Sequence, residues 1–204
     1  MTTRILIADD HKIVRDGLKR ILAGSDIEVA AEAASGDEAL ALVKACDFDI
    51  AMVDMSMPGL SGIDLIKRLK TEKPALKLLV LSMHGEHQYA ARALKAGASG
   101  YLTKDSAAEQ LVGALRKIAA GGVHISEAAA ASLVAAQHAP HETLSDREFE
   151  VLKLLVEGLG PTDIGDKLHL SVKTVSTHKT RILEKLQLGS TAELVRYALE
   201  HKLV

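Results

Sequence analysis

The sequence is poor in several features that would each point to a class of protein. Cys46 is the only cysteine among 204 residues, so an internal disulfide is excluded and a reducing compartment is expected. No apolar run has membrane-spanning length, and Asp9 and Asp10 interrupt the apolar start where a signal peptide would continue. No G-x-G-x-x-G follows the first apolar run, which excludes the common dinucleotide-binding loop. These absences predict a soluble cytoplasmic protein with no membrane partner.

An excess of charge of one sign is missing as well. The chain has 25 Lys and Arg against 27 Asp and Glu, a net charge of −2 at pH 7. Residues 144–204 hold nine of each sign, so a nucleic-acid-binding surface there must gather its positive charge on one face. The length exceeds a typical domain of about 100–150 residues, so we expect one medium and one small domain.

Short apolar runs alternate with segments of helical periodicity through the first 120 residues. Turn residues stop each run, so the runs are predicted to be strands at residues 4–8, 27–33, 50–54, 76–82 and 99–104. The helices are predicted at residues 12–22, from 36, from 62, at 86–96 and at 107–119. Strict alternation of this kind predicts an α/β doubly wound domain with a five-stranded parallel sheet.

Polar side chains stand where four of these strands end. Asp9 and Asp10 follow the first strand, Asp54 ends the third, Ser82 the fourth and Lys104 the fifth. Because parallel strands present their carboxyl ends at one edge, we expect these side chains to meet in one crevice. A strand-end Asp alone would equally fit a turn cap, but five such positions in this order favour a shared site.

The residue types suggest phosphoryl chemistry. Crowded carboxylates repel one another, and a hard cation such as Mg²⁺ would relieve that repulsion. With Lys104 and the Ser82 hydroxyl, the cation could neutralise a phosphoryl group on Asp54, the predicted nucleophile. A Mg²⁺-dependent phosphatase is the enzymatic alternative. Such enzymes usually carry a second Asp two residues after the nucleophile, and Ser56 at that position argues against an enzyme.

These motifs resemble those of a known family. D-D at residues 9–10, D-M-S-M-P-G-L-S-G from Asp54, L-S ending at Ser82 and Y-L-T-K ending at Lys104 are similar to the receiver domain of bacterial two-component response regulators. The resemblance implies that a sensor histidine kinase phosphorylates Asp54. It also implies a receiver domain over residues 1–120.

The same resemblance assigns roles around Asp54. It implies that Mg²⁺ is bound by Asp9, Asp10, Asp54 and the Met55 or Ser56 region, through either the backbone or the side chain of Ser56. It implies that Ser82 and Tyr101 form a switch pair, in which the hydroxyl turns toward the phosphoryl group and the aromatic ring moves inward. A receiver that regulates without phosphorylation is the alternative, and the intact acids disfavour it.

Residues 121–143 are predicted to form a linker. The segment begins with Gly121-Gly122, contains no Lys or Arg, and has one predicted helix that starts near Ser126. These features indicate a tether between two domains.

Residues 144–204 change to an all-helical pattern. A capping box at Ser145–Glu148 starts one helix, Gly160-Pro161 a second and Ser171 a third at residues 172–188, and Ser190 caps a fourth. The third helix is predicted to bury one apolar stripe: Val172, Val175, Ile182, Leu183 and Leu186. Two helices joined by a short turn suit a DNA-binding helix-turn-helix, although a protein-binding bundle would share the pattern.

The whole segment resembles the LuxR-type helix-turn-helix domain of the NarL/FixJ family of response regulators. Carried over by position, Ser176, Thr177 and Thr180 would face base edges of promoter DNA. The basic residues would mostly meet phosphates, namely Lys173, Lys179, Arg181 and Lys185. Relatives often have Lys or Arg at the base-facing positions, so hydroxyls there suggest readout through methyl groups, water and DNA shape. A homodimer on DNA is expected, with the fourth helix as its surface.

Overall fold

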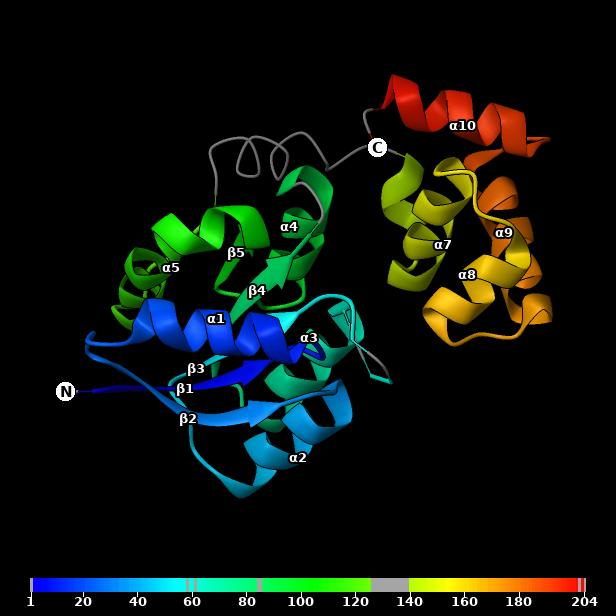
Figure 1. Cartoon of the computed structure of the whole chain (residues 1–204). Helices are drawn as coiled ribbons and strands as arrows, with labels where there is room; N and C mark the ends of the chain where they lie inside the picture. Colours follow the sequence, from blue (N-terminus) through cyan, green and yellow to red (C-terminus); the bar gives the residue numbers. More distant parts are fainter. Residues whose placement is uncertain are drawn as a thin grey trace. The chain divides into compact units, whose positions relative to one another are not determined.

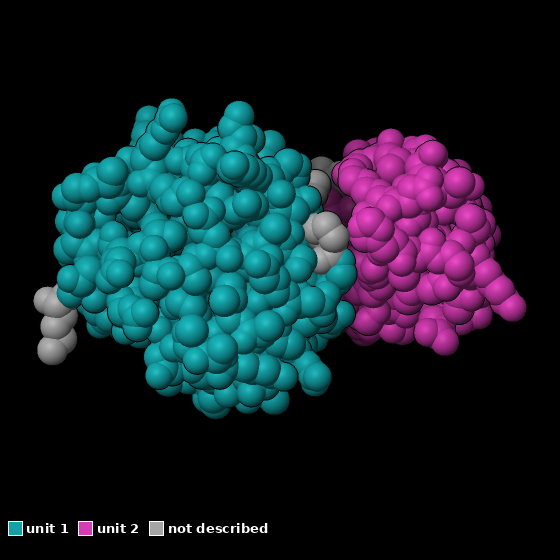
Figure 2. Space-filling model, turned by 60° about the horizontal axis from the view of Figure 1, so that its bottom comes forward, with its two compact units in different colours: residues 1–133 teal, residues 134–204 magenta. Residues whose placement is uncertain are grey.

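The computed structural model describes residues 2–57, 59–60, 62–83, 86–125, 140–201 and 203. The chain forms two compact units, Met1–Leu133 and Val134–Val204 (Figure 2). The linker helix predicted near Ser126 falls on residues 126–139 and lies outside the described residues. Within the described ranges, no helix combines the length and apolar character that a bilayer-spanning segment requires.

The first unit contains one five-stranded sheet. Its strands are β1 (Thr3–Ala8), β2 (Ile27–Ala33), β3 (Ile50–Asp54), β4 (Lys77–Ser82) and β5 (Gly100–Thr103). They pair in parallel in the order β2-β1-β3-β4-β5, as a doubly wound sheet does. Every residue of β3 is buried, which explains its unbroken apolar sequence. The sequence prediction is confirmed, and the carboxyl ends of β1 and β3 lie side by side.

Helices cover both faces of this sheet (Figure 1). α1 (Lys12–Leu22) and α5 (Lys104–Ala119) lie on one face, and α2 (Gly36–Ala45) and α3 (Gly62–Glu72) on the other, while α4 (Glu86–Lys95) neighbours α3 and β5. The first face is sealed by a core that includes Ile5, Ile7, Leu18, Leu22, Leu111 and Leu115. Burial of these side chains helps to hold the strand ends in fixed positions.

The start of α5 differs from the sequence prediction. We expected Lys104 to end a strand and the helix to begin near Ala107, but Lys104 is already the first residue of α5. Thr103 explains the early start because its hydroxyl accepts a hydrogen bond from Ser106 N at 3.3 Å, as an N-cap does. The peptide bond from Lys104 to Asp105 is trans.

The second unit is all-helical. Its α-helices are α7 (Asp146–Val156), α8 (Pro161–Leu168), α9 (Val172–Leu186) and α10 (Thr191–Glu200), preceded by the short 3-10 helix η2 (Pro140–Thr143). Ser145, Ser171 and Ser190 cap three of these helices through their hydroxyls, as their sequence positions predict.

The turn between α8 and α9 is unusually close. Leu170 N donates to Gly165 O at 2.8 Å, and His169 adopts a left-handed conformation with φ of 53°. A Cβ on Gly165 would lie 2.7 Å from Leu170 O, so the turn requires glycine there. This contact sets the angle between the two helices of a helix-turn-helix.

Most of the predicted apolar stripe on α9 faces the core, but one member does not. Val175, Ile182 and Leu186 are buried, and Leu183 is half-buried. Val172 was predicted to be buried and is 47% exposed. It is the first residue of α9 and lies at the edge of the stripe, where the neighbouring helices do not cover it.

Candidate functional site

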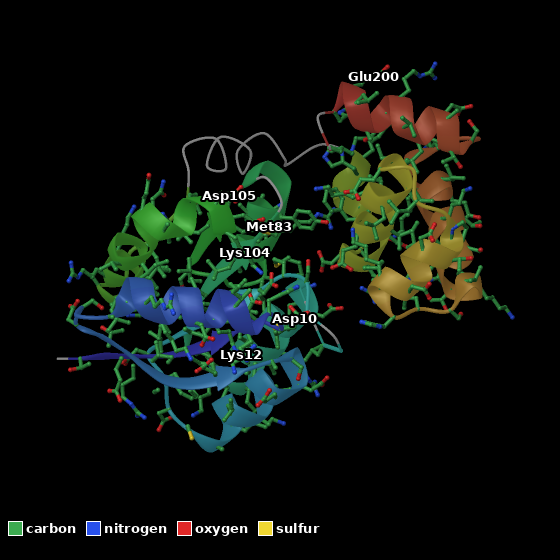
Figure 3. All side chains as sticks on the ribbon, viewed as in Figure 1. Asp10, Lys12, Met83, Lys104, Asp105 and Glu200 are labelled. Carbon is green, nitrogen blue, oxygen red and sulfur yellow. The ribbon has the colours of Figure 1, made fainter. Side chains whose placement is uncertain are left out.

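Four polar side chains meet at the carboxyl edge of the sheet, namely Asp9, Asp10, Asp54 and Lys104, and Ser82 ends the neighbouring strand β4 at the same edge. We call these five residues the acceptor pocket. Lys104 Nζ lies 2.8 Å from Asp54 Oδ2, to which it donates a hydrogen bond, and 2.7 Å from Asp9 Oδ2 in an ion pair. Figure 3 shows Asp10 and Lys104 at this edge of the first unit. The structure therefore brings together residues that are up to 95 positions apart, as numbers 9 and 104 show.

The acceptor pocket is almost closed to solvent. Asp9 and Asp54 are at most 2% exposed and Ser82 is 1% exposed, whereas the side chain of Asp10 keeps 28%. Tyr101, the other half of the predicted switch pair, is 1% exposed on β5. It lies two residues before Thr103, the sheet partner of Ser82, so by strand alternation Tyr101 and Thr103 share one face of the sheet.

Burial and charge compete at Asp54. Removal from water raises the pKa of the Asp54 carboxyl above its ordinary 3.8, and the neighbouring Asp9 adds to the rise. The hydrogen bond and positive charge of Lys104 act in the opposite direction, as does the bond from Ser56 N, but burial outweighs them. The ionised form of Asp54 is therefore less favoured in this pocket than it would be in water.

Lys104 is the cation that holds this setting together. Burial lowers the pKa of its ammonium, but hydrogen bonding and attraction to Asp54 and Asp9 outweigh burial, so the pKa is raised above 10.5. The ammonium also sits at the amino end of α5, where the helix dipole disfavours a positive charge. The two carboxylates therefore supply the stabilisation that the helix end does not.

The donor set suits a hard divalent cation. Three carboxylates face one ammonium, which leaves an excess of negative charge. Asp9 Oδ2 and Asp10 Oδ1 are buried, and they lie 2.7 Å from Lys104 Nζ and 2.8 Å from His11 Nδ1, respectively. A carboxylate oxygen has more than one lone pair, so both oxygens can also act as ligands. Ser56, named with this site from the sequence, has an exposed side chain, and its backbone N donates to Asp54 Oδ1 at 3.3 Å. The residues present therefore fit Mg²⁺.

Sequence reasoning missed His11, which lies beside the acids. Possible ligand atoms of Asp9, Asp10, His11 and Asp54 all lie within 4.8 Å of one another. His11 Nδ1 is 2.8 Å from Asp10 Oδ1, and His11 N donates to Asp9 Oδ1 at 2.8 Å. Its place directly after the acidic pair was the available signal.

The loop after Asp54 is fixed by contact with α2, which the sequence did not reveal. A Cβ on Gly36, the first residue of α2, would lie 1.6 Å from Leu60 O. Leu60 N also donates to Asp37 Oδ2 at 3.4 Å, a long hydrogen bond. The amino end of α2 thus holds the loop that carries Ser56.

The second candidate site is the exposed side of α9, which we call the recognition face. Its members share solvent exposure and are Lys173, Ser176, Thr177, Thr180 and Arg181. Lys179 is half-buried. All six were named from the sequence as DNA contacts, and the five exposed residues share one side of the helix.

Lys185, the seventh predicted DNA contact, is engaged within its own unit. Its Nζ lies 2.6 Å from Glu148 Oε2 and 3.2 Å from Thr143 O. Burial raises the pKa of Glu148, but hydrogen bonds from Lys185 and Ser145 outweigh burial and bring the pKa below 4.5. Lys185 therefore ties α9 to the capping box of α7.

His178 is half-buried on α9. Its Nδ1 is buried without a hydrogen-bond partner. Burial lowers the pKa of the imidazole below 6.5, and the positive charges of Arg147 and Arg181 lower it further, against attraction from Glu148. A neutral ring suits this position.

Each of the two units matches a known protein family. The family model for the response regulator receiver domain matches residues 5–116, and that for bacterial regulatory proteins of the luxR family matches residues 142–198. The oxygen regulatory protein NreC of Staphylococcus epidermidis is 40% identical over 215 residues, covering 98% of this chain and 99% of that protein.

Solved structures give the same result. RcsB from Salmonella enterica serovar Typhimurium, bound to promoter rprA with the phosphomimetic BeF3−, is 28% identical with a TM-score of 0.67, covering 97% of this chain and 98% of that chain. A LuxR-family response regulator from Aurantimonas is 36% identical with a TM-score of 0.62, covering 67% and 99%. The chain therefore belongs to the two-component response regulators of the NarL/FixJ type, which join a receiver domain to a LuxR-type DNA-binding domain.

Proposed function

We propose that Asp54 accepts a phosphoryl group from a sensor histidine kinase and that the phosphorylated receiver promotes homodimerisation and promoter binding. Residues 1–120 form the receiver domain, residues 121–143 the linker and residues 144–204 the DNA-binding domain. The protein works in the cytoplasm, where its promoter DNA lies. The observation that supports this proposal most is the bridge from Lys104 to Asp54 and Asp9, at 2.8 and 2.7 Å, inside a closed pocket.

The acceptor pocket has the groups that the transfer requires. An Asp54 carboxylate oxygen attacks phosphorus while the bond from phosphorus to the kinase histidine nitrogen breaks, and the imidazole keeps the electron pair. Lys104 and the Ser82 hydroxyl stabilise negative charge on the phosphoryl oxygens. Mg²⁺ held by Asp9, Asp10, Asp54 and the Ser56 region supplies further charge neutralisation when it is bound.

Tyr101 connects the pocket to the rest of the receiver. When the Ser82 hydroxyl turns toward the phosphoryl group, it vacates space that the buried ring of Tyr101 then fills. Packed cores shift between discrete arrangements, so a small movement at Ser82 reaches the receiver surface.

The recognition face supplies the DNA contacts. Lys173, Lys179 and Arg181 bind phosphates, and Ser176, Thr177 and Thr180 face base edges in the major groove. Solved complexes of the relative RcsB with DNA, one of them with two RcsB dimers, support DNA binding and a dimer on DNA.

The test uses the full-length chain with acetyl phosphate and Mg²⁺. Intact mass should show one added phosphate on the wild type and on Asp64→Asn, whose carboxylate is exposed on α3, and none on Asp54→Asn. Phosphorylation should raise the dimer fraction in sedimentation and strengthen promoter binding in a footprinting assay. Phosphate on Asp54→Asn would refute the acceptor assignment. An unmodified wild type that still binds promoters would support the phosphorylation-independent alternative.

A further inference from the structure

The three hydroxyls of the recognition face donate their hydrogen bonds to backbone carbonyls of their own helix. Ser176 Oγ donates to Val172 O at 3.0 Å, Thr177 Oγ1 to Lys173 O at 2.9 Å, and Thr180 Oγ1 to Ser176 O at 3.1 Å. A hydroxyl has one hydrogen and two lone pairs. With the hydrogen used inside the helix, each exposed oxygen offers only acceptor capacity to a partner.

Acceptors of this kind distinguish between bases. In the major groove guanine presents the acceptors N7 and O6, whereas adenine N6 and cytosine N4 are donors. Ser176, Thr177 and Thr180 can accept from adenine or cytosine without rearrangement. Hydrogen bonding to guanine would require each hydroxyl to give up its bond to the helix backbone, so guanine is the disfavoured base.

Apolar groups on the same face separate adenine from cytosine. Val172 is 47% exposed and lies four and eight residues before Ser176 and Thr180, which places the three in one row along α9. Thr177 and Thr180 add methyl groups beside their hydroxyls. Thymine carries the only base methyl in the major groove of DNA, so an A·T pair offers both a donor and a methyl contact.

We infer that the recognition face reads A·T pairs in the major groove, with hydroxyl oxygens accepting from adenine N6 and Val172 with the threonine methyls contacting thymine C5 methyls. The inference rests on the proposed DNA-binding function and adds the base-edge chemistry to it. It also gives a role to Val172, whose apolar side chain is otherwise left in water at the start of α9.

The test selects from a library of random DNA duplexes with the full-length phosphorylated chain at fixed salt. Substitutions on α9 should change the base preference at certain positions of the selected half-sites. At those positions the wild type should select A·T pairs. Thr180→Val keeps the shape and removes the acceptor, and it should lower the preference for adenine at one position by about fivefold. Thr71→Val is the matched control, because Thr71 on the receiver helix α3 makes the same type of bond, to Lys67 O at 2.8 Å.

A second measurement isolates the methyl contact. Replacing thymine by uracil in the best duplex removes only the methyl group, and it should weaken binding by the wild type about threefold to fivefold. The same replacement should have a smaller effect with Val172→Ala, because only the threonine methyls then remain to contact the thymine methyl. Val172 and Thr180 are exposed, so substitutions there should preserve the fold. Hydrogen exchange over α9 in each variant should therefore match that of the wild type.

The outcomes separate the inference from the function it rests on. Guanine at the positions altered by Thr180→Val, or a uracil effect equal in the wild type and Val172→Ala, would overturn the inference. Binding without any preferred sequence would overturn the inference and leave DNA binding in place. Failure to bind any duplex would instead overturn the proposed function.

Discussion

The two domains treat polar groups in opposite ways. The receiver buries Asp9 and Asp54 and stabilises them with one partly covered cation, Lys104. The recognition face leaves Ser176 and Thr180 in water, with their hydrogens already donated to the helix. One site is closed and carries unbalanced charge, whereas the other is open and electrically neutral at its centre.

This difference assigns the response to a change of charge to the receiver and the proposed contact with DNA bases to α9. Electrostatic interactions are stronger in a buried site than in water, so the phosphoryl group of the proposed reaction would strongly alter the balance among Asp54, Asp9 and Lys104. The hydroxyls of α9 are neutral and already paired, so they have no comparable response to a change of charge. The capacity to switch therefore belongs to the receiver, and α9 presents a fixed chemical surface.

The largest expected effect comes from removing the cation of the closed site. Lys104→Met should slow phosphorylation of Asp54 by acetyl phosphate about 100-fold, because the transferred group loses its main charge partner. Phosphate incorporation followed by intact mass measures the rate. Lys44→Met is the control, since Lys44 is half exposed and pairs with Glu72 at 3.6 Å on the surface. Equal rates for both variants would contradict the role of Lys104.

Backbone packing beside the closed site should give the next largest effect. Gly36→Ala should lower the free energy of unfolding by about 2 kcal/mol, because its Cβ would collide with Leu60 O. Gly17→Ala on α1 meets no atom within 4 Å and should instead stabilise the chain by up to about 1 kcal/mol. Urea unfolding measures both. Similar free energies of unfolding for the two variants would show that the loop after Asp54 can move aside for the added Cβ at little cost.

On α9, two valines three residues apart should behave differently. Val175→Ala should cost about 2 kcal/mol of stability, because Val175 is fully buried. Val172→Ala should change stability by less than about 0.5 kcal/mol, because Val172 is half exposed. Hydrogen exchange resolved over residues 146–200 measures the second domain alone. A large cost for Val172→Ala would mean that its role is structural.

The smallest effect concerns the charge on Asp54. Because the folded pKa is raised, the unfolded chain releases this proton first as the pH rises above 3.8, and the wild type loses stability until the pH passes the folded value. Asp54→Asn lacks this loss and should be more stable by about 1 kcal/mol at neutral pH, in the presence of a chelator. Below pH 3.8 the gain should vanish. Thermal unfolding across pH gives the measurement. A gain that persists in acid would have another cause.

Much of this molecule follows from sequence pattern. Alternating apolar runs and helices predicted the sheet, and the strand-end rule predicted that Asp54 and Lys104 would meet. Periodicity predicts which side of a helix is apolar, but it does not predict how far the neighbouring helices cover that side. For this reason the predicted burial of Val172 was wrong. Pairings made only in the folded chain, such as Lys185 with Glu148, leave no signal at either residue alone. The early start of α5 at Lys104 depends on one N-cap residue, Thr103, and the apolar periodicity used for the prediction does not take caps into account.

The turn at Gly165 has a consequence for how operators change during evolution. Because a Cβ on Gly165 would lie 2.7 Å from Leu170 O, a close main-chain approach rather than exposed side chains constrains how α9 follows α8. If α9 contacts DNA as proposed, substitutions along its outer surface would alter which promoter is chosen without tilting the helix. New target genes become reachable by single exchanges, while the docking geometry is inherited unchanged.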